Sequence, residues 1–177
     1  KILGNVTVER YIQNKKAWRL LYMPTKHDYQ TIKEAWQEGA VDSAYKPGGY
    51  GIQITGGSLA AWKDSGFDKQ TSTPSVKIYD PVANNWEGIP STKIRFDTAK
   101  AYMVFVRGDR TITSFGQSSN PTVLREKGSL NSGDITWNNL GTAGNQFVAI
   151  GNPYPSAIVA NSFINATVLS GIVKSNP

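Results

Sequence analysis

Two short unbroken apolar runs stand out in a chain whose other apolar residues mostly alternate with polar ones. The runs are residues 102–106 and 147–150. An unbroken run of this length is typical of a strand buried on both faces, whereas alternation is typical of a strand with one face in water. We therefore expect both runs at the centre of a β-structure. After a polar turn at Gly108 the chain alternates again around Ile112, which predicts a hairpin leading from the first run towards the surface.

Further short apolar segments, separated by glycine, proline and asparagine turn signals, predict more strands. These are expected at residues 5–12, 17–23, 50–55, 76–79, 123–126, 135–137 and 168–173. A helix is expected at residues 31–38, because Ile32, Ala35 and Trp36 share one helical face and Gly39 follows as a C-cap. Ser156 is expected to cap a second short helix that extends to about residue 163.

About ten short strands at this spacing predict an all-β fold, a two-sheet β-sandwich of jelly-roll-like type with one or two short helices. The composition agrees. Of 177 residues, 39% are hydrophobic and 18% charged, with 17 glycines and nine prolines, which is typical of a globular protein with many turns. No linker divides the chain, so residues 1–177 are expected to form a single domain. We interpret this domain as a piece of a longer polypeptide.

The absence of cysteine and the distribution of charge exclude several kinds of functional site and partner. The chain contains no cysteine, which excludes a disulfide, a thiolate metal site and a cysteine nucleophile, and fits a cytosolic or an exported bacterial protein. The net charge is +6, but the basic residues are dispersed and only Lys15 and Lys16 are adjacent. No nucleic-acid partner is therefore expected, while weak attraction to an anionic glycan or cell surface stays open. No stretch approaches the roughly 20 apolar residues that span a bilayer, so no membrane insertion is expected.

No motif for catalysis, metal binding or cofactor binding is found. His27, the only histidine, lies in a polar loop. The acidic residues form no pair inside an apolar strand, where burial would raise a carboxyl pKa for glycoside hydrolysis. We therefore expect no enzyme activity, no catalytic residue, no metal and no cofactor, with hydrolysis as the weakest alternative. The tripeptide Arg107-Gly108-Asp109 matches an integrin-binding sequence, but we interpret it as a turn whose charges keep it in water.

The aromatic side chains offer the clearest binding candidates. Trp18 and Trp36 are interpreted as core residues, whereas Trp62 and Trp86 adjoin polar loops. Exposed rings can stack on the apolar faces of sugars. These observations predict an alternative function, carbohydrate binding, with the following ring-stacking residues: Trp62, Trp86, Tyr50 and Tyr79.

Six segments, taken in order, carry a resemblance to a known family. They are residues 4–12, 16–21, 35–39, 51–56, 101–110 and 150–156, with GNVTVERYI at the start and IGNPYPS at the end. Together they resemble a conserved β-rich domain of very large surface proteins of Bacteroidota. The resemblance covers nearly the whole chain and implies type IX secretion, display on the cell surface, and adhesin-like or gliding-associated proteins built as filaments or repeats. It supplies no catalytic motif.

The leading hypothesis is therefore a non-enzymatic structural or adhesive module of a large secreted cell-surface protein. Its expected partners are neighbouring domains or copies of the same protein, joined by strand addition at open sheet edges, with polysaccharide as the alternative partner. The resemblance also implies O-glycosylation at an Asp-Ser/Thr-small apolar pattern, which Ser43 and Thr98 match.

Overall fold

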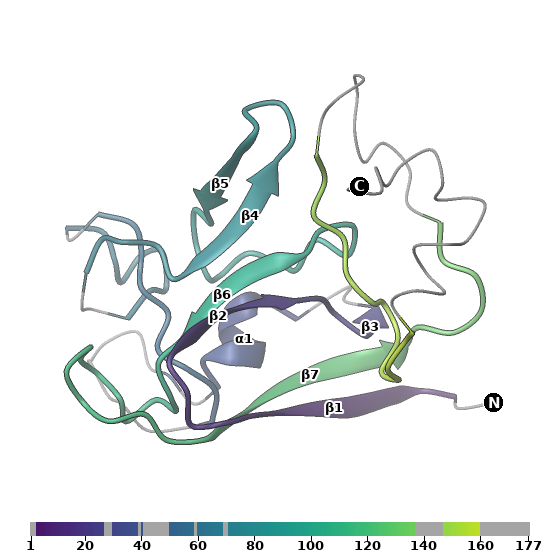
Figure 1. The fold of residues 1–177 in the computed structure, drawn as a ribbon, viewed down its shortest axis with the longest axis horizontal. Coiled ribbons are helices and arrows are strands. Elements are labelled where there is room, and N and C mark those ends of the chain that lie inside the picture. The colour runs from purple at the N-terminus through teal and green to yellow at the C-terminus, as the bar shows by residue number, and fades with distance from the viewer. Residues whose placement is uncertain are drawn as a thin grey trace, which may run out of the picture.

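The computed structural model describes residues 3–26, 30–38, 40, 50–58, 60–68, 71–136 and 147–159, and contains two antiparallel sheets (Figure 1). Sheet A has the strand order β1 (Asn5–Ile12), β7 (Thr122–Leu130), β3 (Thr25–Lys26). Sheet B has the order β2 (Ala17–Leu21), β6 (Tyr102–Val106), β4 (Val76–Asp80), β5 (Asn85–Gly88). The described residues contain one α-helix, α1 (Ile32–Trp36). The predicted all-β, two-sheet sandwich is confirmed.

The strands pair as in a long hairpin that has been rolled up. β1 pairs with β7, β2 with β6 and β4 with β5, so early strands pair with late ones around a central hairpin. This nested pairing is that of a jelly roll. A complete jelly roll would pair β3 with a further strand that lies between β5 and β6 in the sequence. In place of that strand pair, the structure has one antiparallel bridge, between Thr31 and Arg95. The consecutive strands β1 and β2 are therefore edge strands of different sheets.

The helix α1 is short but well capped. The Thr31 side chain accepts a hydrogen bond from Glu34 N (3.2 Å), and the Glu34 carboxylate accepts one from Thr31 N (2.7 Å), which together form a capping box. The apolar face predicted from the sequence, including Trp36, is buried. The helix ends at Trp36, earlier than expected, with Gln37 as the C-cap, and the predicted cap Gly39 lies outside the described residues.

Trp36 of α1 fills the space between the two sheets. Its side chain is fully buried and meets the rings of Phe96 and Tyr102 edge-on, at 4.8 and 5.8 Å between centroids. Apolar residues of both sheets complete this core, among them Ile12, Leu21, Val76, Val104, Val106 and Leu124. Aromatic pairs add ring–ring attraction to the free energy of area burial, so we expect this cluster to contribute strongly to the stability of the sandwich.

Residues 147–150, the second predicted central strand, do not form a strand, and this prediction is wrong. Phe147 is 72% exposed, and the segment reaches the start of β6 through a hydrogen bond from Ala101 N to Ala149 O (3.2 Å). Because β2 and β4 already occupy both edges of β6, the centre of sheet B has no place for a further strand. The run lies instead at one end of the sheet (Figure 1). An apolar run alone does not distinguish these cases.

The second arm of the predicted hairpin, after Gly108, is a loop rather than a strand. Ile112 is buried, but neighbouring backbone N–H groups are bound by a side chain. Gln117 Oε1 accepts hydrogen bonds from Thr113 N and Ser114 N, both 2.8 Å. These donors are unavailable for a strand ladder, so side chain–backbone bonds decide the conformation here.

The predicted strand at residues 50–55 is also wrong, for a similar reason. Ile52 and Ile54 are fully buried, yet Ile52 N donates to Trp36 O (2.8 Å) at the end of α1, and Ile54 N donates to Asp68 Oδ2 (2.8 Å). The segment therefore crosses the core as irregular chain. Residues 135–136 and 157–159 are likewise outside any strand or helix, against the strand predicted at 135–137 and the helix predicted from Ser156. Residues 137 and 160–177, with the predicted strand 168–173, lie outside the described residues.

Candidate functional site

The outer face of sheet B is apolar and aromatic. Side chains alternate between the two faces along each strand, and directly paired residues share a face. Val76 and Val104 pair and are fully buried, so their rows face the core and the alternate rows face outward. We call the outward residues, together with Phe115 from the loop after β6, the aromatic face. Its members are Trp18 and Leu20 of β2, Met103 and Phe105 of β6, Lys77 and Tyr79 of β4, Trp86 of β5, and Phe115.

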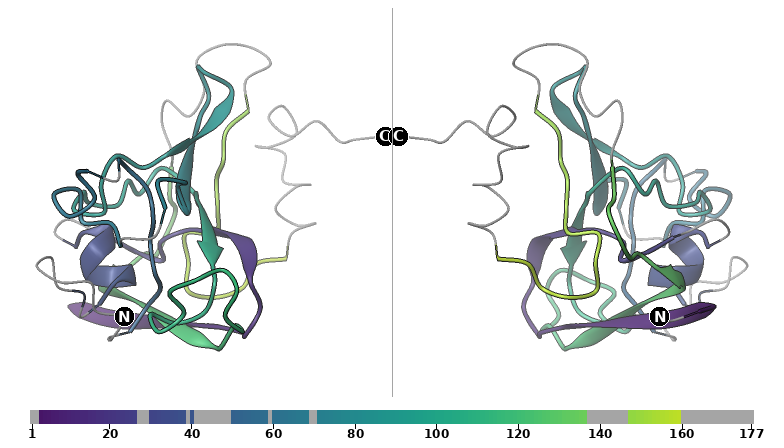
Figure 2. Two further views of the ribbon diagram at one scale, coloured as in Figure 1. Left: turned by 90° about the vertical axis from the view of Figure 1, so that its left-hand side faces the viewer. Right: turned by 90° about the vertical axis from the view of Figure 1, so that its right-hand side faces the viewer.

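One end of the aromatic face is strongly exposed. Trp18 is 45% exposed, Leu20 54% and Phe115 71%. The Phe105 ring lies 5.3 Å from that of Trp18 and 6.3 Å from that of Phe115, between centroids. Figures 1 and 2 show residues 147–159 on the outer side of sheet B, opposite α1, and Leu20 lines a hollow together with residues 151, 152 and 154–157 of this segment. Neighbouring exposed apolar side chains of this kind indicate an interaction site, whereas single ones are ordinary.

The register of β2 explains why Trp18 is outside. Leu21 at the end of the strand is buried in the core, and a period of two then places Arg19 on the inner face and both Trp18 and Leu20 on the outer face. Arg19 pairs with the fully buried Val104, which fixes this orientation. The prediction that Trp18 is a core residue is therefore wrong, whereas the same prediction for Trp36 is confirmed.

Lysine side chains lie over the rings of this face. Lys16 Nζ is 5.1 Å from the centroid of the Phe115 ring, and Lys77 Nζ is 5.5 Å from that of Trp18. Lys16 also donates hydrogen bonds to the carbonyl groups of Phe115 and Gln117, which hold the loop against β2. None of the members of the aromatic face is acidic. The face thus combines aromatic surface with positive charge, an arrangement that cation–π attraction stabilises.

The predicted ring-stacking residues lie in three places. Tyr79 and Trp86 pair across β4 and β5, with ring centroids 5.4 Å apart, and both belong to the aromatic face. Tyr50 is exposed but lies under the Arg125 guanidinium, 3.9 Å from the ring centroid, beside sheet A. Trp62 is half-buried and packs against the core. The structure therefore brings together only Tyr79 and Trp86 of the four.

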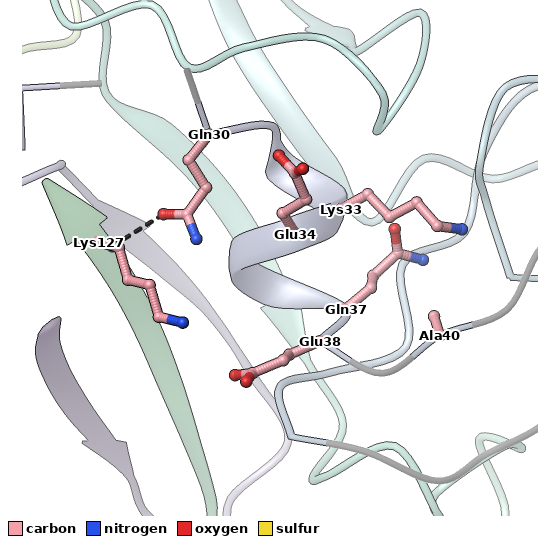
Figure 3. A pocket seen from close by; sticks show the side chains of 7 residues that line it. All are labelled: Gln30, Lys33, Glu34, Gln37, Glu38, Ala40 and Lys127. Atoms are coloured by element: carbon pink, nitrogen blue, oxygen red, sulfur yellow. Dashed lines mark hydrogen bonds between the residues drawn. The ribbon is translucent and has the colours of Figure 1, made fainter. Parts of the chain in front are cut away.

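A polar hollow of about 460 Å³ lies along α1 and β7 (Figure 3). It is lined by Gln30, Lys33, Glu34, Gln37, Glu38, Ala40 and Lys127. Gln30 Oε1 accepts a hydrogen bond from Lys127 N (2.8 Å), and Glu38 accepts one from Arg125 (2.7 Å). Glu34 belongs to the capping box of α1. These bonds fasten the helix to β7, so we assign the hollow a structural role.

A buried ion pair was missed by the sequence analysis. Arg110 Nη2 lies 2.8 Å from Asp68 Oδ1, with side chains only 1% and 9% exposed. Asp68 Oδ2 also accepts hydrogen bonds from Gln37 Nε2 (2.7 Å) and Ile54 N (2.8 Å). Both charges are thus paired and hydrogen-bonded, as burial requires. The pair joins the loop after β6 to the segments that cross the core.

Glu126 in β7 is a single buried carboxyl, which the sequence analysis did not single out because it looked for a pair of carboxyls inside an apolar strand. It is 0% exposed, and its Oε1 accepts a hydrogen bond from Trp36 Nε1 (3.1 Å). Burial raises its pKa from the ordinary 4.5 to about 7, although the Trp36 bond and the charge of Arg10 act in the opposite direction. The signal was present in the alternation of Thr122, Leu124 and Glu126. Because Glu126 faces the core between the sheets, we connect it with stability rather than catalysis.

The tripeptide at 107–109 forms a turn, as expected, but it is not held in water throughout. The Arg107 side chain is buried at 9% exposure. Gly108 has a φ of +143°, and a Cβ atom there would lie 2.5 Å from Asn120 Oδ1. Asp109 N donates to the same oxygen, so the turn is packed onto the loop before β7. The prediction that the flanking charges keep the tip of this turn in water is therefore wrong, because Arg107 and Gly108 are both buried.

The two predicted O-glycosylation residues differ in what the structure describes. Thr98 is exposed, as such a modification requires, and its carbonyl group accepts a hydrogen bond from the Tyr22 hydroxyl. Ser43 and the single histidine, His27, lie outside the described residues. O-glycosylation at Ser43 and Thr98 stays a prediction.

Comparisons of the chain with protein-family models, with curated proteins and with solved structures find no match. Within the described ranges, no helix has the length and apolar character to cross a bilayer. The same ranges contain no group of three or more His, Cys, Asp or Glu side chains placed to hold a metal ion. The class of the protein is thus an all-β, jelly-roll-like sandwich, and its function has to be argued from the aromatic face.

Proposed function

We propose that the chain is a non-enzymatic structural or adhesive module of a large secreted cell-surface protein, and that the aromatic face is its adhesive surface. The observation that carries the proposal is the exposure of Trp18, Leu20 and Phe115 together on one side of sheet B. These side chains contribute little to the stability of an isolated domain, whereas a partner that covered them would gain the free energy of apolar burial.

The scaffold suits such a role because it fixes the rings in place. β2 pairs with β6 over all five of its residues, so Trp18 and Phe105 are held directly opposite each other. Residues on paired strands are positioned more precisely than residues on loops, which lowers the entropy lost on binding. The six segments that resemble a Bacteroidota surface-protein domain support type IX secretion and display on the cell surface as part of this proposal.

A bead-adhesion assay tests the proposal. Beads coated with the wild-type chain are expected to attach to a second layer of the same chain or to a layer of polysaccharide. The double variant Trp18→Ser/Phe115→Ser is expected to lose this attachment. Tyr11→Ser is the matched control, because Tyr11 is 66% exposed on the outer face of sheet A. Wild-type beads that attach no better than albumin-coated beads, or double-variant beads that attach as well as wild type, would refute the proposal.

Strand addition is the proposed route to assembly with neighbouring copies. β1 is an eight-residue edge strand that contains no proline, and an edge of this kind is a template for pairing with another chain. We expect the wild-type chain to associate as its concentration rises in sedimentation velocity. Thr7→Lys places a charge on the strand and should shift the distribution towards monomer. A wild-type chain that stays monomeric across the full concentration range would exclude this route.

A further inference from the structure

We propose that the aromatic face binds a linear anionic polysaccharide, a chain of sugar rings that carries carboxylate or sulfate groups. This inference rests on the proposed adhesive function and names the ligand class of the same surface. Carbohydrate binding is thereby assigned to residues of one sheet face, most of which differ from those predicted from the sequence.

The arrangement of rings and charge favours an extended ligand. Trp18, Phe105 and Phe115 lie at one end of the aromatic face, and the Tyr79–Trp86 pair lies across the sheet on β4 and β5. Lys77 lies between them, because β4 separates β6 from β5 and Lys77 pairs with Met103 on one side and Gly88 on the other. A ligand that crossed the strands would meet rings, then an ammonium group, then rings again.

The charge of the face selects an anionic ligand over a neutral one. Lys16 and Lys77 lie over exposed rings, and no member of the face is acidic. Sugar rings present C–H groups to aromatic faces, while carboxylate or sulfate groups pair with ammonium groups through charge-assisted hydrogen bonds. The net charge of +6 adds long-range attraction for a polyanion.

The same charges argue against two other occupants. A second copy stacked face to face would bring Lys16 and Lys77 towards their own counterparts, and like charges in an interface oppose association. Single-stranded nucleic acid also stacks on aromatic side chains, but it requires a basic groove that follows the phosphate backbone. Two lysines separated by rings do not form such a groove, so the observations favour a polysaccharide.

Affinity electrophoresis of the purified chain tests the inference. Native gels contain polygalacturonate as the carboxylated ligand, dextran sulfate as the sulfated one, neutral dextran, or a single-stranded oligothymidylate. We expect retardation by one or both acidic polysaccharides, and the gel that retards the chain identifies the anionic group. Retardation should weaken between about 0.05 and 0.5 M salt, since the Debye length shortens.

Variants assign the binding to the aromatic face. Trp18→Ala and Lys77→Gln should each raise the apparent Kd for the acidic polysaccharide about tenfold. Tyr11→Ala and Lys26→Gln are the controls for loss of an exposed ring and of a positive charge, because both residues are exposed on sheet A. Unfolding midpoints equal to that of the wild-type chain would show that each variant is folded.

Several outcomes would overturn the inference. They are equal retardation by neutral dextran, tighter binding of the oligothymidylate, an effect of Lys77→Gln no greater than that of Lys26→Gln, and no retardation by any polysaccharide. Retardation by neutral dextran that depends on Trp18 but not on Lys77 would refute anionic selectivity and leave the adhesive function standing. A third result is possible if no polysaccharide binds. If wild-type beads then attach to a layer of the same chain, and the Trp18→Ser/Phe115→Ser variant does not, polysaccharide binding is refuted and the adhesive function stands.

Discussion

The outer faces of the two sheets differ in the contacts that their side chains make within the domain. On sheet A, Arg125 donates a hydrogen bond to Glu38 (2.7 Å), lies 3.9 Å from Glu9 and covers the ring of Tyr50. On the outer side of sheet B, the exposed residues Trp18, Leu20 and Phe115 are apolar. The first face forms its polar contacts within the domain. The second exposes neighbouring apolar side chains, and this contrast is the basis for proposing a binding function on sheet B.

Both outer faces depend on the same core, so a substitution that disrupts this core should give the largest loss of stability and should affect both faces. Trp36→Ala deletes the ring that lies between the sheets and should lower the free energy of unfolding by about 3–5 kcal/mol, as large aromatic truncations do. Urea unfolding followed by circular dichroism measures this effect. A loss below about 1 kcal/mol would contradict the assignment of Trp36 as the centre of the core.

The second prediction concerns the inner face of sheet A, where the buried carboxyl of Glu126 should make the free energy of unfolding depend on pH. The folded pKa of Glu126 is raised to about 7, so the folded state retains a proton that the unfolded chain releases near 4.5. Stability should therefore fall as pH rises from about 4.5 to about 7, by about 3 kcal/mol, and then level off.

Glu126→Gln keeps the side-chain size and removes this titration. The variant should show no such fall, so that above pH 7 it should be the more stable protein in urea unfolding. The control is the wild-type chain at the same pH values and constant ionic strength. Identical pH profiles for the two proteins would contradict the prediction.

The third prediction concerns the polar outer face of sheet A. Arg125→Gln removes a partly exposed ion pair with Glu38, and we expect a loss of about 1 kcal/mol or less that shrinks as salt is added. Thermal unfolding at low and high salt measures it, with Lys26→Gln as the control for loss of an exposed charge. A loss that does not depend on salt would indicate packing on Tyr50 rather than charge pairing.

The smallest effect on stability is expected on the aromatic face. Trp18→Ala should change the free energy of unfolding by only about 0.5 kcal/mol, because the ring is 45% exposed and lies outside the core. Equal urea midpoints for Trp18→Ala and wild type would support the comparison. A loss similar to that of Trp36→Ala would show that the ring supports the fold instead of binding.

Much of the fold could be predicted because its signals are local. The alternation in residues 5–12 and 76–79, the apolar run at 102–106 and the spacing of α1 each depend on neighbouring residues. The side that a strand presents depends on its partners. The run Ala17–Leu21 has apolar residues on both faces, so only its register with β6 shows that Trp18 points outward.

The remaining features depend on contacts distant in sequence. Asp68 and Arg110 are 42 residues apart, and each looks like an ordinary surface charge until folding brings them together. Phe115 lies in a loop that the sequence pattern predicts as a strand, and its position over Phe105 follows from the bonds of Gln117 and Lys16. Such pairings leave no periodic signal, so no argument from spacing would have found them.

The pairing of β1 with β7 determines how the domain would respond to a pulling force. The two strands are antiparallel, with Asn5 opposite Ser129 and Ile12 opposite Thr122. Tension applied between residue 5 and residue 130 therefore acts at the same end of both strands and loads the hydrogen bonds one rung after another. Bonds loaded in sequence give way at low force, so this ladder would open like a zipper and lengthen the chain gradually under strain.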